Sequence, residues 1–189
     1  MKLFQSVIPD VVLIHSEVFQ DARGWFMESF NQEVFNQELL ALGLPTPGNF
    51  VQDNLSCSKK GVLRGLHYQR SPHAQGKLVR VLSGSIFDVA VDLRENSDSF
   101  GAYVSFELSE TNKHMVWIPE GFAHGFVAME DNTHVLYKTT DFYRSEYESS
   151  VFWDDPTLNI DWPLRDEVLI SLKDQAAQLF LSDPLKIFH

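Results

Sequence analysis

The chain has 189 residues, of which 44% are hydrophobic, and a formal net charge of −11 at pH 7. A chain of this length can bury one sizeable core, so we predict a single domain over residues 1–189. The acidic balance argues against a nucleic-acid partner, because the protein as a whole repels polyanions.

Most of the predicted elements are short strands, rich in β-branched or aromatic residues and separated by Gly, Pro, Asn and Ser turns. In chain order they cover residues 11–15, 25–30, 77–82, 85–93, 103–108, 114–118 and 133–140. This spacing is typical of an all-β antiparallel sandwich or barrel rather than of alternating β-α units. We therefore expect the functional residues at the mouth of a β-scaffold.

Two helices interrupt the predicted strands. Residues 33–42 place apolar residues on one stripe and end at Gly43, which suits a left-handed cap. Near the C-terminus, Ser171 and Asp174 have the spacing of a capping box, which predicts a short helix that continues through Phe180.

The middle of this acidic chain is basic, because no carboxylate occurs between Asp53 and Asp88. A local group of cations on an anionic protein predicts a pocket for a small anion rather than a nucleic-acid surface. The cationic and imidazole side chains of this stretch are Lys59, Lys60, Arg64, Arg70, Lys77 and Arg80, with His67 and His73.

Several features bear on where the protein works. No run approaches the roughly 20 apolar residues that a membrane helix needs. The first ten residues are too polar, and are broken too early by Pro9, to indicate a signal peptide. Cys57 is the only cysteine, which agrees with a reducing compartment. We expect a cytoplasmic protein with no membrane partner.

A series of ordered motifs covers nearly the whole chain: D-A-R-G-W-F-M-E (21–28), Q-D-N (52–54), G-V-L-R-G-L-H (61–67), Q-G-K-L-V-R-V (75–81), F-D-V-A-V-D-L-R (87–94), W-I-P-E-G-F-A-H-G-F (117–126), L-Y-K-T (136–139) and L-K-D (172–174). With these motifs the sequence resembles the dTDP-4-dehydrorhamnose 3,5-epimerase family. The resemblance implies a cupin-like jelly roll with short peripheral helices and a homodimer that exchanges N-terminal strands. It also implies epimerisation of dTDP-4-keto-6-deoxyglucose at carbons 3 and 5, without cofactor or metal, on the path to dTDP-L-rhamnose.

The implied reaction needs a base. The ketone at carbon 4 acidifies the hydrogens on carbons 3 and 5, so a base can remove one, leave an enolate, and let a proton return on the other face. The resemblance implies that His67 is this base and that Asp174 orients its ring. A carboxylate on one ring nitrogen fixes the tautomer and stabilises the imidazolium. On the sequence alone, Asp174 is better explained as part of a helix cap after Ser171.

The enolate and the returning proton need two more groups. Lys77, at the entry to an apolar strand, is the candidate that places positive charge where negative charge develops. Tyr137, in the middle of a strand, is by resemblance the acid that returns the proton. The alternatives are a solvated lysine at a strand end and an aromatic residue on a sandwich face.

Two further polar residues belong to these motifs. By resemblance, His124 hydrogen-bonds the substrate near the ketone, and its alternative is a satisfied turn histidine after Gly121. Asp88 alternates with apolar neighbours, so it either braces the basic pocket or faces outward from its strand.

A dTDP sugar carries a diphosphate, which arginine binds through paired hydrogen bonds, and a thymine, on which aromatic rings stack. The resemblance implies that Arg64 binds phosphate and that Arg23 and Glu28 reach over from the partner subunit. For each of these residues the alternative is an ordinary surface or packing position. The resemblance also implies that Gln52 and Asn54 contact the nucleotide and that Glu148 and Lys173 complete the binding set. Phe26 and Tyr143 are candidate stacking surfaces.

Two local features depart from the regular strand pattern and from the usual motif. Strict strand alternation would send Arg64 and His67 to opposite faces, so we expect a bulge or bend at Gly65 that lets both enter one pocket. Leu55 follows Q-D-N where many relatives have histidine, and this bears on the nearby nucleotide contacts.

Other classes of function stay open on the sequence. A metal-dependent cupin typically carries H-x-H, but Gln69 stands two residues after His67, and the two distant histidines His67 and His124 make a poor ligand set. A non-catalytic sugar-binding or nucleotide-binding module would need Arg64 and aromatic residues but neither His67 nor Tyr137. Within the resembling family, epimerisation at a single carbon is a further alternative.

Overall fold

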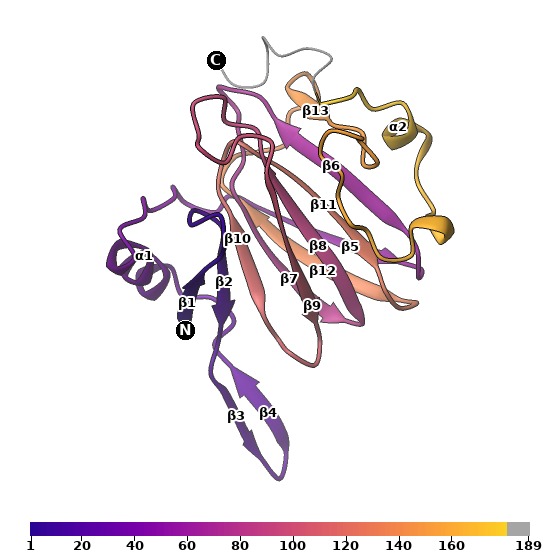
Figure 1. The fold of residues 1–189 in the computed structure, drawn as a ribbon. Helices are drawn as coiled ribbons and strands as arrows, with labels where there is room; N and C mark the ends of the chain where they lie inside the picture. The colour runs from indigo at the N-terminus through magenta and orange to yellow at the C-terminus, as the bar shows by residue number, and fades with distance from the viewer. Residues whose placement is uncertain (181–189) are drawn as a thin grey trace.

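The computed structural model describes residues 1–180, which form two antiparallel sheets and a separate β3–β4 hairpin (Figure 1). The six-stranded sheet has the order β1-β2-β10-β7-β12-β5, and the five-stranded sheet has the order β13-β6-β11-β8-β9. This is the all-β, cupin-like jelly roll that the sequence predicts. The strands are β1 (Lys2–Gln5), β2 (Val12–His15), β3 (Val18–Asp21), β4 (Gly24–Met27), β5 (Gln52–Ser58), β6 (Leu63–Gln69), β7 (Lys77–Ser83), β8 (Ser85–Asp92), β9 (Tyr103–Ser109), β10 (Met115–Ile118), β11 (Phe122–Ala128), β12 (Thr133–Thr139) and β13 (Glu148–Ser150). The helices are α1 (Gln32–Ala41), α2 (Leu172–Gln175) and a 3-10 turn at Arg165–Glu167.

The main core lies between the two sheets, because alternate residues of their strands turn apolar side chains inward. Val79, Val116 and Val135 of the six-stranded sheet are fully buried in one cluster with Ile86 and Ala90 of the five-stranded sheet. Each buried valine or isoleucine contributes roughly 1.5–3 kcal/mol relative to an exposed side chain. The sandwich is therefore a firm frame for polar side chains at its open end.

Helix α1 covers the outer face of the six-stranded sheet. It begins at the N-cap Asn31, whose side chain accepts hydrogen bonds from two backbone N–H groups of the first turn. Its apolar stripe buries Phe35 and Leu39, and the Phe35 ring meets Trp117 edge-on at 5.7 Å. The helix predicted over residues 33–42 is thus confirmed, with a start at Gln32.

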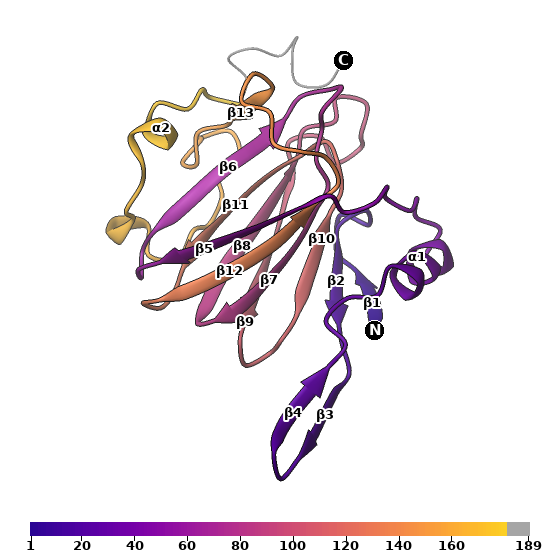
Figure 2. The same cartoon turned by 180° about the vertical axis from the view of Figure 1, so that it is seen from behind.

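Residues 151–180, which follow β13, cover the outer face of the five-stranded sheet. Helix α2 lies beside β6 in both views (Figure 1 and Figure 2). Helix α2 is shorter than predicted and ends at Gln175. The prediction through Phe180 was wrong because Gln178 instead forms a bridge with Val151. Phe180 then packs on Phe100, with the ring centroids 5.2 Å apart.

The strands predicted from periodicity leave out several that the structure contains, among them β5, β6 and β11, although the bend expected at Gly65 already placed residues 64–67 on a strand. Strand β5 (Gln52–Ser58) is mostly polar and has no continuous apolar face. Strand β6 (Leu63–Gln69) contains a glycine that breaks the alternation. The strand predicted over residues 25–30 is instead the second arm of the hairpin, β4, and ends at Met27.

Within residues 1–180, no helix is long and apolar enough to cross a membrane. The single domain over residues 1–189 stays a prediction, since residues 181–189 lie outside the described part of the chain.

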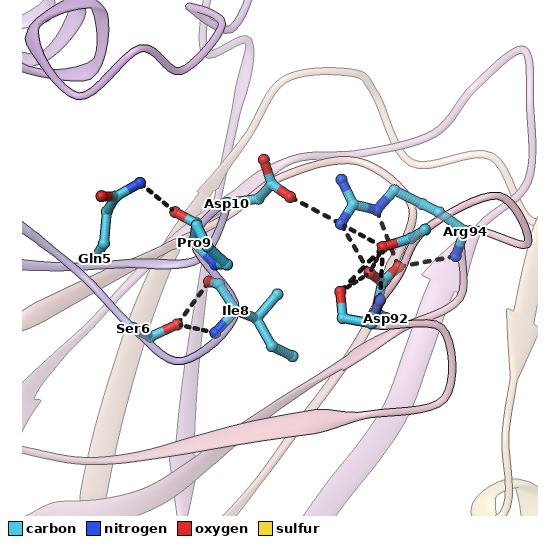
Figure 3. A network of polar contacts seen from close by, with 9 residues as sticks. Gln5, Ser6, Ile8, Pro9, Asp10, Asp92 and Arg94 are labelled. Carbon is cyan, nitrogen blue, oxygen red and sulfur yellow. Dashed lines mark hydrogen bonds and ion pairs between the residues drawn. The ribbon is translucent and has the colours of Figure 1, made fainter.

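A polar network joins the N-terminal β1–β2 turn to the end of β8 (Figure 3). Asp92 is fully buried, and its carboxylate accepts hydrogen bonds from the Arg94 guanidinium and from the hydroxyls of Ser97 and Ser99. Arg94 also reaches Asp10, with the Nη2 and Oδ2 atoms 2.9 Å apart. Burial alone would raise the pKa of Asp92, but these hydrogen bonds hold it below its usual value. Asp92 is therefore a buried anion that its neighbours stabilise.

We expect Asp92→Ala to lower the free energy of unfolding by about 2–4 kcal/mol, because it removes the buried carboxylate that accepts hydrogen bonds from Arg94 and from two hydroxyls. Urea unfolding followed by circular dichroism measures this. Asp98→Ala, in the exposed part of the same loop, is the matched control and should change stability by less than about 0.5 kcal/mol. Equal effects of the two variants would show that the network does not stabilise the fold.

Candidate active site

A cavity of about 370 Å³ is lined by strands of both sheets and by the segment that leads into α2. Side chains from β5, β6, β7, β11, β12 and β13 reach it. Polar groups from distant parts of the sequence therefore meet in one place. The predicted site residues that line the cavity are Gln52, Asn54, Arg64, His67, Lys77, His124, Tyr137, Tyr143, Glu148, Lys173 and Asp174.

Strand β6 changes its alternation at Gly65, as expected. Its pairing with β11 shifts register, so that His67 lies opposite His124 while Arg64 lies opposite Phe126. Gly65 has a φ of +148°, and a Cβ atom there would lie 2.5 Å from the Cα atom of Gly125. Only glycine fits this close approach of two main chains. The irregularity lets both Arg64 and His67 line the cavity.

His67 and Asp174 form a close pair, with 2.6 Å between His67 Nε2 and Asp174 Oδ1. Burial alone would raise the pKa of Asp174, but the hydrogen bond and charge of His67, together with Ser171 and Lys173, hold it below its usual value. An ionised Asp174 accepts the Nε2–H of the ring, which leaves Nδ1 as the basic nitrogen.

Asp174 makes both of the contacts that its two interpretations call for, because they use different atoms. The helix cap uses its backbone N–H, which donates to Ser171 Oγ over 3.1 Å. The carboxylate is left for His67 and is almost completely buried.

Lys77 is a buried cation rather than a solvated lysine at a strand end, since only 6% of its surface is exposed. Its Nζ donates to the His67 carbonyl oxygen over 2.9 Å. Burial lowers the pKa of Lys77 to about 8, against the opposing charges of Asp88 and Glu148. The ammonium is thus mostly charged at neutral pH but holds its proton less tightly than a surface lysine.

A second imidazole–carboxylate pair is formed by His124 and Asp88, with 2.8 Å between Nε2 and Oδ2. Burial lowers the pKa of His124, and the nearby Lys77 and His67 lower it further, whereas Asp88 raises it. A neutral His124 that donates Nε2–H to Asp88 presents Nδ1 as an acceptor. Asp88 is fully buried, so the outward-facing alternative for this residue was wrong.

Tyr137 lies in the middle of β12, with its ring against the core and its side chain also lining the cavity. Burial raises the pKa of its hydroxyl, Arg64 lowers it and Glu148 raises it. The net direction is upward, so Tyr137 stays a protonated phenol at neutral pH and can donate a proton.

Arg64 is the cation best placed to meet an anion. Its Nε donates to Ser58 Oγ over 3.1 Å, and Nη2 lies 3.5 Å from the Cys57 carbonyl oxygen. Within the described residues 1–180, no carboxylate forms an ion pair with it. Lys173, in contrast, is bound to Glu148 with 2.6 Å between Nζ and Oε2.

Comparison with known proteins identifies the family of this chain. The model of the dTDP-4-dehydrorhamnose 3,5-epimerase family matches residues 5–182. The chain belongs to this family. A dTDP-4-dehydrorhamnose 3,5-epimerase of Pseudomonas aeruginosa is 53% identical over 180 residues, covering 95% of this chain and 96% of the relative.

Solved structures of epimerases superpose on this member of the family over nearly its whole length. A dTDP-6-deoxy-D-glucose-3,5-epimerase from Legionella pneumophila, in complex with dTDP-4-keto-L-rhamnose, has a TM-score of 0.88 and 47% identity, covering 95% of this chain and 92% of that one. A 3'-monoepimerase from Streptomyces bikiniensis, in complex with dTDP-quinovose, has a TM-score of 0.86 and 30% identity, covering 97% and 89%.

Three candidate substrate-binding residues lie outside the cavity of their own chain. Arg23, Phe26 and Glu28 are on or next to the β3–β4 hairpin, which extends away from the two sheets (Figure 1 and Figure 2). Arg23 is exposed and pairs with Asp21. Glu28 accepts a hydrogen bond from Asn31.

The lysines and arginines of the basic stretch between Asp53 and Asp88 do not all reach the cavity. Of these residues, only Arg64 and Lys77 line the cavity of this family member. Lys59 and Lys60 are exposed in the turn before β6. Arg80 is three residues after Lys77 on β7, and its side chain approaches Met27 instead. The stretch as a whole therefore does not form one anion pocket.

Sequence reasoning missed several lining residues of the epimerase cavity. Ser56 follows Gln52 and Asn54 at every second position of β5, so strand alternation could have found it. Its Oγ atom is buried and has no hydrogen-bond partner in the described part of the chain. Gln69 and Gln75 also line the cavity, and Gln75 begins the motif over residues 75–81 although it was not named as a site residue.

Proposed function

We propose that this chain is an isomerase that converts dTDP-4-keto-6-deoxy-D-glucose to dTDP-4-keto-L-rhamnose by epimerisation at carbons 3 and 5, in dTDP-L-rhamnose biosynthesis. The observation that carries this proposal is the His67–Asp174 pair beside the buried Lys77, in a cavity that also holds Tyr137. The name of the Pseudomonas relative and the product bound in the Legionella structure support the same reaction.

In the first step, His67 Nδ1 removes the hydrogen from a carbon next to the ketone. The Nε2–H bond to Asp174 fixes the tautomer that makes Nδ1 basic, and the carboxylate stabilises the imidazolium that forms. A base positioned in this way contributes about 10²–10⁴-fold to the rate.

The electron pair moves onto the ketone oxygen, and Lys77 is the group that we assign to this oxygen. One of its three N–H bonds is held by the His67 carbonyl, which leaves two for the enolate. His124 was expected near the ketone, but a neutral ring with Nε2–H donated to Asp88 can only accept. We therefore assign His124 to a hydroxyl of the sugar.

Tyr137 returns a proton to the opposite face of the carbon. Because burial keeps its pKa above the usual value, the phenol is protonated when the enolate forms. Repetition at the second carbon requires His67 to lose its proton and Tyr137 to regain one between the two steps.

The nucleotide end of the substrate is assigned to the outer part of the cavity. Arg64, free of any carboxylate within residues 1–180, binds the diphosphate. Tyr143, whose hydroxyl donates to Glu148 over 2.7 Å, offers a ring for the thymine. Gln52 and Asn54 line the same region. The location that we propose is the cytoplasm, where a nucleotide sugar would be available.

The function is tested by incubating the protein with dTDP-4-keto-6-deoxyglucose in heavy water and following both carbons by NMR. We expect deuterium and inversion at carbons 3 and 5, with no loss of turnover after exhaustive chelation. Inversion at one carbon alone would support the single-centre activity named for the Streptomyces relative. Activity lost on chelation and restored by one divalent ion would support the metal-cupin alternative.

We expect turnover to fall as pH rises through about 8, because burial lowers the pKa of Lys77 to about 8 and only its ammonium stabilises the enolate. The fall should approach tenfold per pH unit above that value. Titration of Tyr137 cannot cause this fall in turnover above pH 8, since the pKa of its hydroxyl lies above the usual value near 10.

The control is Lys77→Met, whose low residual turnover should show no such fall between pH 7 and 9. A wild-type turnover number that stays constant over this range would contradict the role given to Lys77.

We also propose a homodimer in which the β3–β4 hairpin enters the partner's site. The hairpin extends from the sandwich (Figure 2). It exposes Phe19, Trp25 and Phe26, which a monomer would leave in water. Arg23 is almost wholly exposed at its tip. Most homo-oligomers are two-fold dimers, in which such an exchange is reciprocal.

Mixing a His67→Ala chain with an Arg23→Ala chain is expected to restore activity that neither has alone. In the mixed dimer, one site combines an intact His67 with an intact Arg23 from the other chain. Steady-state turnover of the mixture, after subunit exchange is verified with tagged chains, measures this. If exchange occurs and the mixture is no more active than the separate variants, Arg23 does not serve the partner.

A further inference from the structure

Residues 141–147, here called the rim loop, connect β12 to β13 and carry Tyr143 at the edge of the cavity. The Tyr143 side chain is more than half exposed, so packing does little to fix it. Its hydroxyl donates to Glu148, the first residue of β13. The position of the ring therefore depends on how the backbone of the loop is held.

Two glutamine side chains hold this backbone on both sides of Tyr143. Gln69 Nε2 donates to the Phe142 carbonyl over 3.1 Å, and Gln69 Oε1 accepts from the Arg144 N–H over 2.5 Å. Gln52 Oε1 accepts from the Tyr143 N–H over 2.9 Å. Backbone groups of three consecutive residues are thus bound by these two side chains.

The two glutamines come from different sheets. Gln52 begins β5 of the six-stranded sheet, and Gln69 ends β6 of the five-stranded sheet. Gln69 is only 3% exposed, and its second Nε2–H donates to the His73 carbonyl over 2.7 Å. Its amide therefore uses both donors and its acceptor, and it bonds the rim loop to the loop after β6.

We propose that Gln69 is a positioning residue for the nucleotide end of the substrate, acting through the backbone of Tyr143. This inference rests on the function proposed above, in which Tyr143 meets the thymine. Gln69 itself touches the rim loop rather than the reacting carbons, so its effect should fall on affinity and not on proton transfer.

The chemistry of the side chain explains why an amide is needed here. Leucine has a similar size but would leave the Phe142 carbonyl and the Arg144 N–H without their partners. Glutamate would keep the acceptor but would turn a carboxylate toward the carbonyls of Phe142 and His73. Both changes release the same loop by different means, so they form a matched pair of variants.

Binding of dTDP, measured by titration calorimetry, tests the proposal without requiring turnover. We expect Gln69→Leu and Gln69→Glu each to weaken dTDP binding by about tenfold or more, and to raise KM while kcat changes less than about threefold. The control is Thr133→Val, which removes another hydrogen bond from a buried side chain to the backbone. Thr133 is not among the residues that line the cavity, so this variant should leave dTDP affinity unchanged.

A double-mutant cycle shows whether Gln69 acts through Tyr143. In a Tyr143→Ala background, Gln69→Leu should weaken dTDP binding by less than about twofold, because the ring that it positions is gone. Should Gln69→Leu fail to fold, Gln69→Glu carries the same cycle.

Three outcomes would overturn the inference. Additive effects in the cycle, or a fall in kcat with unchanged dTDP affinity, would show that Gln69 acts by another route while the proposed function stands. A wild-type protein that neither binds dTDP nor turns over the nucleotide sugar would remove the proposed function and this inference together.

Discussion

Replacing His67 with alanine is expected to abolish deuterium incorporation at both carbon 3 and carbon 5 of dTDP-4-keto-6-deoxyglucose. The variant has no base at the position that Asp174 orients, so no enolate forms on the enzyme. The loss should be at least about 10²–10⁴-fold, the usual contribution of a positioned base. NMR of the substrate in heavy water measures exchange at each carbon separately.

A second histidine provides the control. His134 lies on β12 outside the cavity lining, and its Nδ1 contacts only the Asn132 carbonyl among the hydrogen bonds described. His134→Ala should therefore exchange both hydrogens at the wild-type rate. Substantial exchange at either carbon by a folded His67→Ala protein would exclude His67 as the general base.

Replacing Tyr137 with phenylalanine is expected to separate exchange from inversion. The ring and its core packing remain, but the phenol that can protonate the enolate on the opposite face is lost. His67 and Lys77 can still form and hold the enolate, and His67 can return a deuteron taken from solvent to the original face. Deuterium should therefore enter, while net epimerisation falls by about 10²–10⁴-fold.

Tyr103→Phe is the matched control, because it removes a partly buried phenol whose oxygen accepts from the Asp161 N–H outside the cavity. It should invert both carbons normally. Inversion at the wild-type rate by Tyr137→Phe would show that the phenol only packs. Equal loss of exchange and inversion in a folded variant would instead assign Tyr137 to substrate positioning or to the first proton transfer.

The fold class was predictable because many strands of the sandwich are short, rich in β-branched or aromatic residues, and separated by turn residues. Strands β5 and β6 were not, since one of their faces lines a polar cavity and offers no apolar signal. The hydrophobic pattern is weakest where the site is built. Motif resemblance supplied the site residues there, and the structure brings most of them together.

The environment of each site residue was harder to predict than its identity. Lys77 is charged and begins a strand, which on sequence suggests solvent, yet it is almost fully buried between residues that are far apart in the chain. The capping spacing of Asp174 was interpreted correctly for its backbone, but sequence spacing carries no information about a carboxylate bonded to His67, 107 residues away. Such contacts depend on tertiary structure.

The contact between Gly65 and Gly125 has a consequence for redesign. The main chains of β6 and β11 are already in contact beside His67 and His124. The two strands therefore cannot be moved closer by repacking side chains. They cannot be moved apart without breaking the backbone hydrogen bonds that pair them. Making room for a larger sugar on this side of the cavity would therefore displace His67, the proposed base. Variation aimed at new nucleotide sugars is better placed in the rim loop, where exposed side chains such as Phe142 can change size without displacing the reacting groups.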